Sequence, residues 1–107
     1  MKIKRMTEKD GHYHEELRFY CPGCKQFHYI NDNETKIPDA PVWGFDKDYN
    51  NPTISPSILV QWPDHRCHSF IRYGKIEYLS DCTHELAGKT IELPNIDEDE
   101  TSRINRP

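Results

Sequence analysis

The sequence predicts a mostly β fold: a small, single-domain, antiparallel arrangement of strands. Three observations support this. The 107 residues suit one domain. Short runs rich in β-branched and aromatic residues alternate with segments rich in Pro, Gly, Asn and Asp. Helical periodicity is weak throughout, and only residues 84–87 could form a single helical turn.

Turns, prolines and loop segments mark the ends of the expected strands. The first two flank a tight Cys21-Pro22-Gly23-Cys24 turn, and a later one is bounded by Pro56 and Pro63. A hairpin is expected between residues 66 and 84. Residues 31–41 and 46–52 have the composition of loops. The expected strands outside the hairpin are residues 16–20, 26–30, 42–45, 57–62 and 90–93.

Composition also divides the chain into three parts. Residues 1–15 are polar and expected to be loosely ordered, and residues 16–94 form the β domain. Residues 95–107 form an acidic tail that is expected to be disordered. Apolar residues are few, so the core must be small, and a bound metal would help such a domain to fold.

The predicted hairpin sorts its reactive residues onto two faces. Tyr73-Gly74 suits a two-residue turn, because Gly tolerates positive φ. Ile71 then lies opposite Ile76, and His68 opposite Leu79. Because side chains alternate between faces, Cys67 and Cys82 share one face, while His68 and Asp81 share the other.

Charge and hydropathy argue against nucleic-acid binding, against a membrane span and against secretion. The formal net charge of −4 gives no support for nucleic-acid binding, which usually needs a basic patch. No apolar run approaches the roughly 20 residues that span a bilayer. The basic N-terminus lacks the apolar segment of a signal peptide, so a cytoplasmic location with reduced thiols is expected.

Four cysteines in a reducing compartment predict a metal site more readily than disulfides. Cys21 and Cys24 form a knuckle that can bind one zinc ion, and Cys67 and Cys82 supply a second pair. Four thiolates would complete a tetrahedral, structural site with one zinc per chain. A thioredoxin-like redox pair is the alternative, but its βαβ context is missing. Plain buried thiols are a second alternative.

Histidines leave the ligand set open. His28 follows Cys24 by four residues, and His84 follows Cys82 by two, so either could replace a cysteine. His84 is the first substitute because it shares parity with Cys82, whereas His28 suits a half-exposed strand position. A site with a histidine ligand and a bound water would be catalytic.

A second dense segment is Pro52-Thr53-Ile54-Ser55-Pro56-Ser57. The prolines restrict the chain and could aim a serine at a neighbouring histidine. The competing interpretation is a polar start of a strand, in which the hydroxyls satisfy backbone groups. Ser69 is a poor candidate, because the hairpin points it at the cysteine face.

Three motifs taken together resemble a family of short phage and bacterial proteins. They are residues 52–58, residues 67–76 and residues 81–88, and many phage members share the Cys-Pro-Gly-Cys start. The similarity covers roughly residues 19–94. Relatives encoded beside bacterial ubiquitin-like proteins, with E1-like and E2-like enzymes, carry a domain called BubE that is regarded as a serine peptidase.

This resemblance implies a function. The shared element is a Pro-Ser pair followed by a histidine in an Ile-Arg strand, which maps onto Pro56-Ser57, His68 and Ile71-Arg72. These relatives have serine in place of Cys67 and lack a match to residues 81–84. The implied substrates are ubiquitin-like proteins or their conjugates, met in the cytoplasm of a bacterial host.

The leading hypothesis is therefore a small zinc-stabilised serine peptidase. Ser57 is the nucleophile, His68 the general base and Asp81 the group that orients the imidazole. Ser55 and His84 are the fallback residues. One alternative is a zinc-binding interaction module that docks a host protein through aromatic side chains. The other is a zinc-dependent hydrolase that uses His68 and His84.

Overall fold

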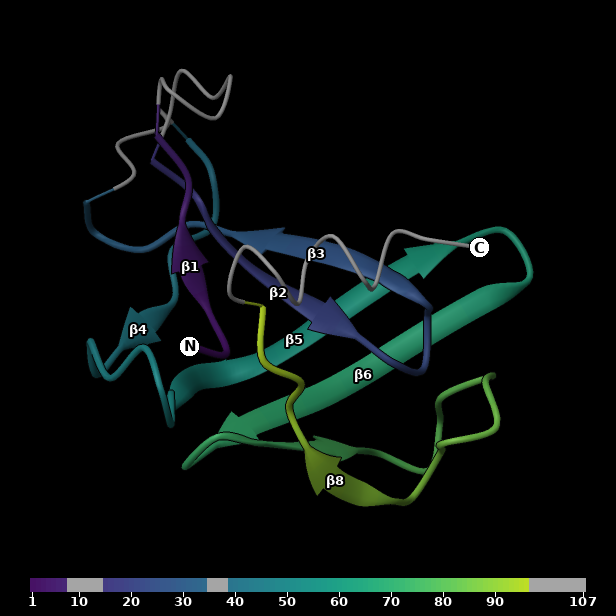
Figure 1. Ribbon diagram of the computed structural model, residues 1–107. Coiled ribbons are helices and arrows are strands. Elements are labelled where there is room, and N and C mark those ends of the chain that lie inside the picture. The colour runs from purple at the N-terminus through teal and green to yellow at the C-terminus, as the bar shows by residue number, and fades with distance from the viewer. Residues whose placement is uncertain (8–14, 35–38, 97–107) are drawn as a thin grey trace.

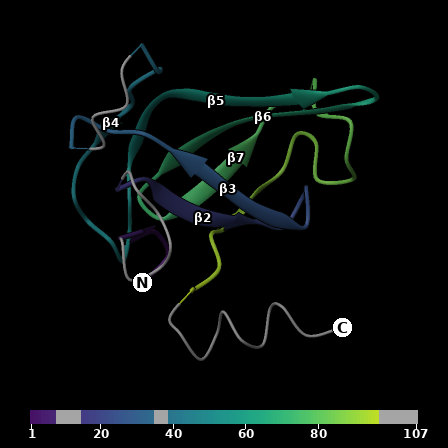
Figure 2. The ribbon, with the colours of Figure 1, turned by 90° about the horizontal axis from the view of Figure 1, so that it is seen from above.

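The fold consists of two antiparallel β-sheets packed face to face, as seen in a computed structural model (Figures 1 and 2). The structure describes residues 1–7, 15–34 and 39–96. The smaller sheet has the order β1-β2-β3 and the larger one the order β4-β5-β6-β7-β8. The strands are β1 (Lys4–Arg5), β2 (Leu17–Cys21), β3 (Gln26–Ile30), β4 (Gly44–Phe45), β5 (Ile54–Trp62), β6 (His65–Arg72), β7 (Lys75–Tyr78) and β8 (Thr90–Glu92).

The mostly β prediction is confirmed. All described strand pairs are antiparallel, and no helix occurs among residues 1–7, 15–34 and 39–96. The described residues accordingly contain no helix that could cross a bilayer.

The core lies between the two sheets. Leu17, Phe19 and Ile30 contribute from the smaller sheet, while Ile58 and Ile71 contribute from the larger one. In Figure 2, β2 and β3 lie beneath β5 and β6, so each sheet has one face in the core and one face outside. This arrangement follows from the alternation of buried and exposed residues along each strand.

The β6–β7 hairpin has the predicted register. Ile71 pairs with Ile76, and Arg72 pairs with Lys75. The connecting residues Tyr73 and Gly74 have φ values of 49° and 79°, as a two-residue turn with positive φ at both positions requires. The face that carries Cys67 is buried, and the face that carries His68 is not.

The two ends of the chain differ from expectation. Residues 1–7 are not loose: β1 pairs with β2, and Ile3 and Met6 are buried. Ile96, at the start of the expected tail, is also buried, and its amide donates a hydrogen bond to Met1 O. In each case isolated apolar side chains pack into the core. The local composition of these polar segments does not predict this burial. Residues 8–14 and 97–107, where the other disorder expectations fall, lie outside the described residues.

Candidate functional site

Ser57 lies in an irregular part of β5. Ile54 pairs with Ile71 and Ile58 with Ser69, so three residues of β5 face a single residue of β6. Such bulges interrupt the regular ladder and redirect side chains, often beside active sites. The indole Nε1 of Trp43 donates a hydrogen bond of 3.2 Å to Ser57 O and so fixes the backbone at this point.

A chain of hydrogen bonds joins Ser57, His68 and Asp81. Nε2 of His68 lies 3.0 Å from Ser57 Oγ, and Nδ1 of the same ring lies 3.3 Å from Asp81 Oδ2. The ring thus contacts a hydroxyl through one nitrogen and a carboxylate through the other. This is the geometry in which a histidine accepts a proton from serine while a carboxylate orients the imidazole.

Asp81 is held by a second partner. Nε of Arg66 donates to the same Oδ2 at a distance of 2.8 Å. Desolvation opposes ionisation of Asp81, but the hydrogen bonds from Arg66 and His68 outweigh it and lower the pKa of the carboxyl. Asp81 is therefore a carboxylate at neutral pH, as the orienting role requires.

The backbone of His68 is fixed by residues that follow β7. The amide of Leu79 donates to His68 O at 2.9 Å. The amide of His68 donates to Cys82 Sγ at 3.2 Å, and that thiol also lies 3.2 Å from His68 O. Cys82 therefore supports the strand that carries the histidine.

The other serines are placed differently. Ser55 pairs with Gly44 at the start of β5, and in the described part of the chain it is Ser57, not Ser55, that hydrogen-bonds His68. Ser69 is buried, as expected for a residue on the cysteine face of the hairpin.

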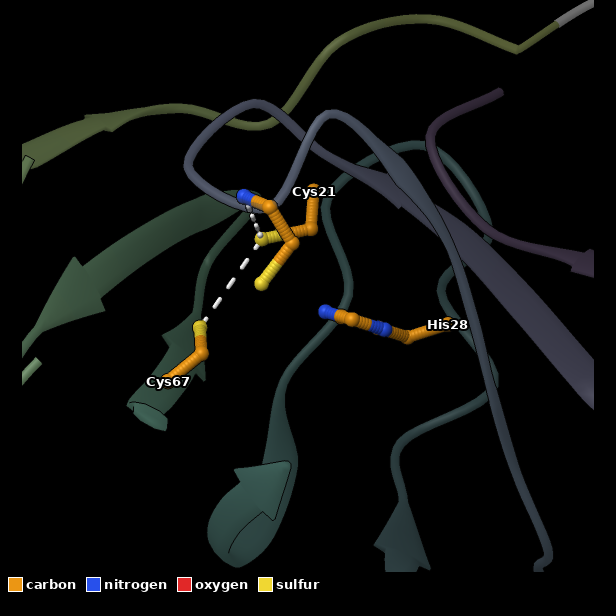
Figure 3. A group of neighbouring side chains, drawn as sticks. Cys21, His28 and Cys67 are labelled. Atoms are coloured by element: carbon orange, nitrogen blue, oxygen red, sulfur yellow. Dashed lines mark hydrogen bonds between the residues drawn. The ribbon is translucent and has the colours of Figure 1, made fainter. Parts of the chain in front are cut away.

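A cysteine-rich cluster occupies the core face behind this site. Sγ of Cys21, Cys24 and Cys67 and a ring nitrogen of His28 lie within 4.8 Å of one another. In Figure 3, Cys21, His28 and Cys67 point toward a common centre. The knuckle turn supplies two of these ligands, β3 supplies the histidine and β6 supplies Cys67. The cluster therefore ties the two sheets together.

The donor atoms suit a metal ion. The two sulfur atoms of Cys21 and Cys67 are 3.9 Å apart. His28 is buried, not half-exposed as expected, and its Nε2 has no hydrogen-bond partner. A buried ring nitrogen without a partner is costly unless a ligand meets it. Three thiolates and an imidazole are one of the common donor sets of structural, tetrahedral zinc sites.

The pKa values of the three thiols also favour a metal ion at this position. A hydrogen bond from Cys67 lowers the pKa of Cys21 to about 3, whereas burial and the charge on Cys21 raise the pKa of Cys24 to about 12. The pKa of Cys67 is raised because it donates to Cys21 and is buried. The cluster thus favours ionisation of one thiol and opposes ionisation of a second, as expected where thiols lie together without a cation.

The structure places Cys82 outside this group of four. It lies with Cys67 and His84 in a second set of possible ligands, in which His84 Nε2 is 3.4 Å from Cys67 Sγ. The predicted set of four cysteines is thus divided: three lie with His28, and Cys82 lies with the substitute ligand His84. His65 adds a contact of 3.1 Å between its Nε2 and Cys24 Sγ.

Comparison with known proteins identifies the family of this chain. A family model described as "Bacterial ubiquitination-like system serine protease (BubE)" matches residues 2–79. The chain belongs to the BubE family. No curated protein and no solved structure matches it.

Some of the site residues lie within the BubE match, and others lie beyond its end. Ser57, His68, Arg66 and the three clustered cysteines lie inside residues 2–79. Asp81, Cys82 and His84 lie beyond it, in the segment that follows β7. The match begins earlier than the expected residue 19, which agrees with the burial of Ile3 and Met6.

Two contributors were missed by the sequence analysis of this BubE member. Arg66 has the same strand parity as His68 and lies on the face of Asp81, and this parity is the signal that could have found it. His65 had no spacing signal, because its contact with Cys24 joins residues 41 positions apart.

Proposed function

We propose that the chain is a serine peptidase in which Ser57, His68 and Asp81 form the catalytic triad. The observation that carries the proposal is the hydrogen-bonded chain from Ser57 Oγ through both nitrogens of His68 to Asp81. Membership of a family described as a serine protease supports the same reaction class.

The geometry is consistent with the following steps. His68 Nε2 accepts the Ser57 proton as Oγ attacks the carbonyl carbon of the scissile bond. The protonated imidazole then donates this proton to the leaving amine, and the C–N bond breaks to leave an acyl-serine. His68 deprotonates a water molecule that attacks the ester, and the imidazolium returns the proton to Ser57 Oγ as the ester C–O bond breaks and the acid is released. Asp81 stabilises the imidazolium and stays ionised, in keeping with its lowered pKa.

We propose ubiquitin-like proteins or their conjugates as the substrates, on the strength of the family description. We further propose that one zinc ion is bound by Cys21, Cys24, Cys67 and His28. Zinc there would hold the knuckle against β6, where Cys67 precedes His68, and would neutralise the gathered thiolates. It would act structurally, on the sheet face opposite to the triad.

The alternative of a metal hydrolase with His68 and His84 has less support. Among the described residues, His68 belongs to neither group of possible metal ligands. Both nitrogens of its ring already contact Ser57 and Asp81.

A fluorophosphonate probe tests the proposal, since such probes react with activated serines. The zinc-loaded chain should be labelled at Ser57, as mapped by peptide mass spectrometry. Ser57→Ala should abolish labelling, whereas Ser55→Ala, the matched control, should retain it. Labelling that persists in Ser57→Ala, or that is absent from the unmodified chain, contradicts the proposal. Absence would favour the interaction module instead.

A further inference from the structure

β5 has a free edge that begins after Ser57, whose carbonyl accepts a hydrogen bond from Trp43 Nε1. On one side β5 pairs with β6 as far as Trp62, whereas on the other side β4 pairs only with Ile54 and Ser55. In the described part of the chain, β5 pairs with no strand other than β4 and β6. Figure 2 shows β5 at the outer margin of the larger sheet.

The backbone of Leu59 and Gln61 points to this free edge. Their partners across the ladder are His68 and Arg66, respectively. The amides and carbonyls of His68 and Arg66 bond residues 79–83, on the side of β6 away from β5. In antiparallel pairs, opposed residues either bond each other or both point outward. Leu59 and Gln61 therefore present amide and carbonyl groups outward.

Beyond the bulge, this edge lacks one common protection against pairing. Free edges of natural sheets commonly carry charged side chains that prevent association with another strand. Residues 52–63 contain no charged side chain. Leu59 is 47% exposed although it is apolar. An uncharged edge with outward backbone groups suits one occupant, an extended uncharged polypeptide segment.

The edge is also continuous with the triad. Leu59 lies directly opposite His68 and two residues from Ser57, so the three side chains share one face. A strand paired along Leu59 and Gln61 would continue toward Ser57 Oγ. An aliphatic side chain on that strand would cover Leu59, roughly two residues from the carbonyl that Ser57 attacks.

We propose that the substrate binds as an added β-strand on the free edge of β5, with an aliphatic side chain against Leu59. This inference rests on the proposed peptidase function, because it assigns the edge to the substrate. It identifies the substrate region as an extended, uncharged segment that contains an aliphatic residue, in preference to a folded surface.

Protection of Ser57 from the fluorophosphonate probe tests the inference without requiring cleavage. Blocked heptapeptides of serine and threonine with one central leucine are added to the zinc-loaded chain. The leucine peptide should slow labelling by roughly fivefold at a concentration where an aspartate analogue has no effect. Methylating each peptide amide in turn should remove the protection at alternate positions only, as strand pairing requires.

Leu59→Asp should remove the protection, which is measured as the ratio of the labelling rates of the same variant with and without peptide. Tyr29→Asp is the matched control: Tyr29 is 43% exposed on β3 of the other sheet, and its replacement should preserve the protection. Uniform effects of amide methylation, or protection that survives Leu59→Asp, would overturn strand addition and leave the peptidase intact. Dimerisation of the chain through this edge, detected by light scattering and abolished by Leu59→Asp, would also overturn it. No labelling under any condition would refute the peptidase itself.

Discussion

At the scale of single residues, Ser57 and His68 should behave as one catalytic unit. Ser57→Ala and His68→Ala should each lower kcat/KM by roughly 10³-fold or more, and the double variant should be hardly worse than either. The reason is the 3.0 Å contact, through which each group is useful only with the other. Hydrolysis of an activated ester measures the effect, with Ser55→Ala as the control. Additive losses would show that the two residues act separately.

In the proposed triad we expect Arg66 to act as a positioning residue, since it contacts Asp81 and not Ser57. Arg66→Gln should lower kcat several-fold and leave KM unchanged, because Asp81 loses its partner at 2.8 Å. Arg66 also contributes to the lowered pKa of Asp81, so its removal should raise that pKa, and the acidic limb of the pH–activity profile should move to higher pH. Arg66→Lys should restore the profile in part. A loss of activity with an unmoved profile would indicate a merely structural role.

At the scale of elements, Gly74 tests the β6–β7 turn. It has a φ of 79°, and an added Cβ would lie 3.0 Å from the Cα of Asn51. Gly74→Val should therefore destabilise the fold by about 2–4 kcal/mol, from backbone strain and the close contact together. Chemical denaturation measures this.

Gly88 separates the two causes. Its φ is 76°, yet nothing lies within 4 Å of an added Cβ. Gly88→Val should therefore cost less than Gly74→Val, because only the strain remains. Equal costs would mean that the contact with Asn51 adds nothing.

The cysteine-rich cluster, which we propose binds zinc, is a second test at this scale, because it joins the knuckle, β3 and β6. His28→Ala should lower zinc content well below one ion per chain, whereas Cys82→Ser should retain the metal. Elemental analysis of chain purified from zinc-supplemented medium decides between them. Loss in Cys82→Ser with retention in His28→Ala would restore the set of four cysteines.

The pH dependence of zinc binding follows from the thiols. The pKa of Cys24 is raised to about 12 and that of Cys67 is also raised, while that of Cys21 is lowered to about 3. Zinc must displace protons from the first two, so binding should release about two protons and weaken as the pH falls. Calorimetry in buffers of different ionisation enthalpy counts the protons. A count near zero would contradict this ligand set.

At the scale of the whole molecule, the N-terminal residues hold the smaller sheet in the core. Ile3 is completely buried, and β1 pairs with β2. Ile3→Ala should cost about 2–4 kcal/mol of unfolding free energy, because it leaves a cavity between the sheets. Val42→Ala, at an exposed position, should change stability by less than about 0.5 kcal/mol. A cost for Ile3→Ala as small as that of Val42→Ala would show that residues 1–7 are dispensable.

The sequence by itself determined the features that depend on local pattern. Alternation along residues 67–78 placed Cys67 on the buried face and His68 on the other, and Gly74 set the register. Those rules need only the period of a strand and the φ of a turn. They also placed His68 and Asp81 on one face, whereas Ser57 was singled out by the family resemblance, and neither gave distances between these groups.

Only the tertiary structure decided what depends on contacts between distant segments. The bulge in β5 and the contact from Trp43 place Ser57, and not Ser55, against His68. The packing of one sheet on the other brings His28 to Cys67 and buries Ile3. No local periodicity encodes these contacts, because they arise from the shared burial of residues that are far apart in the chain.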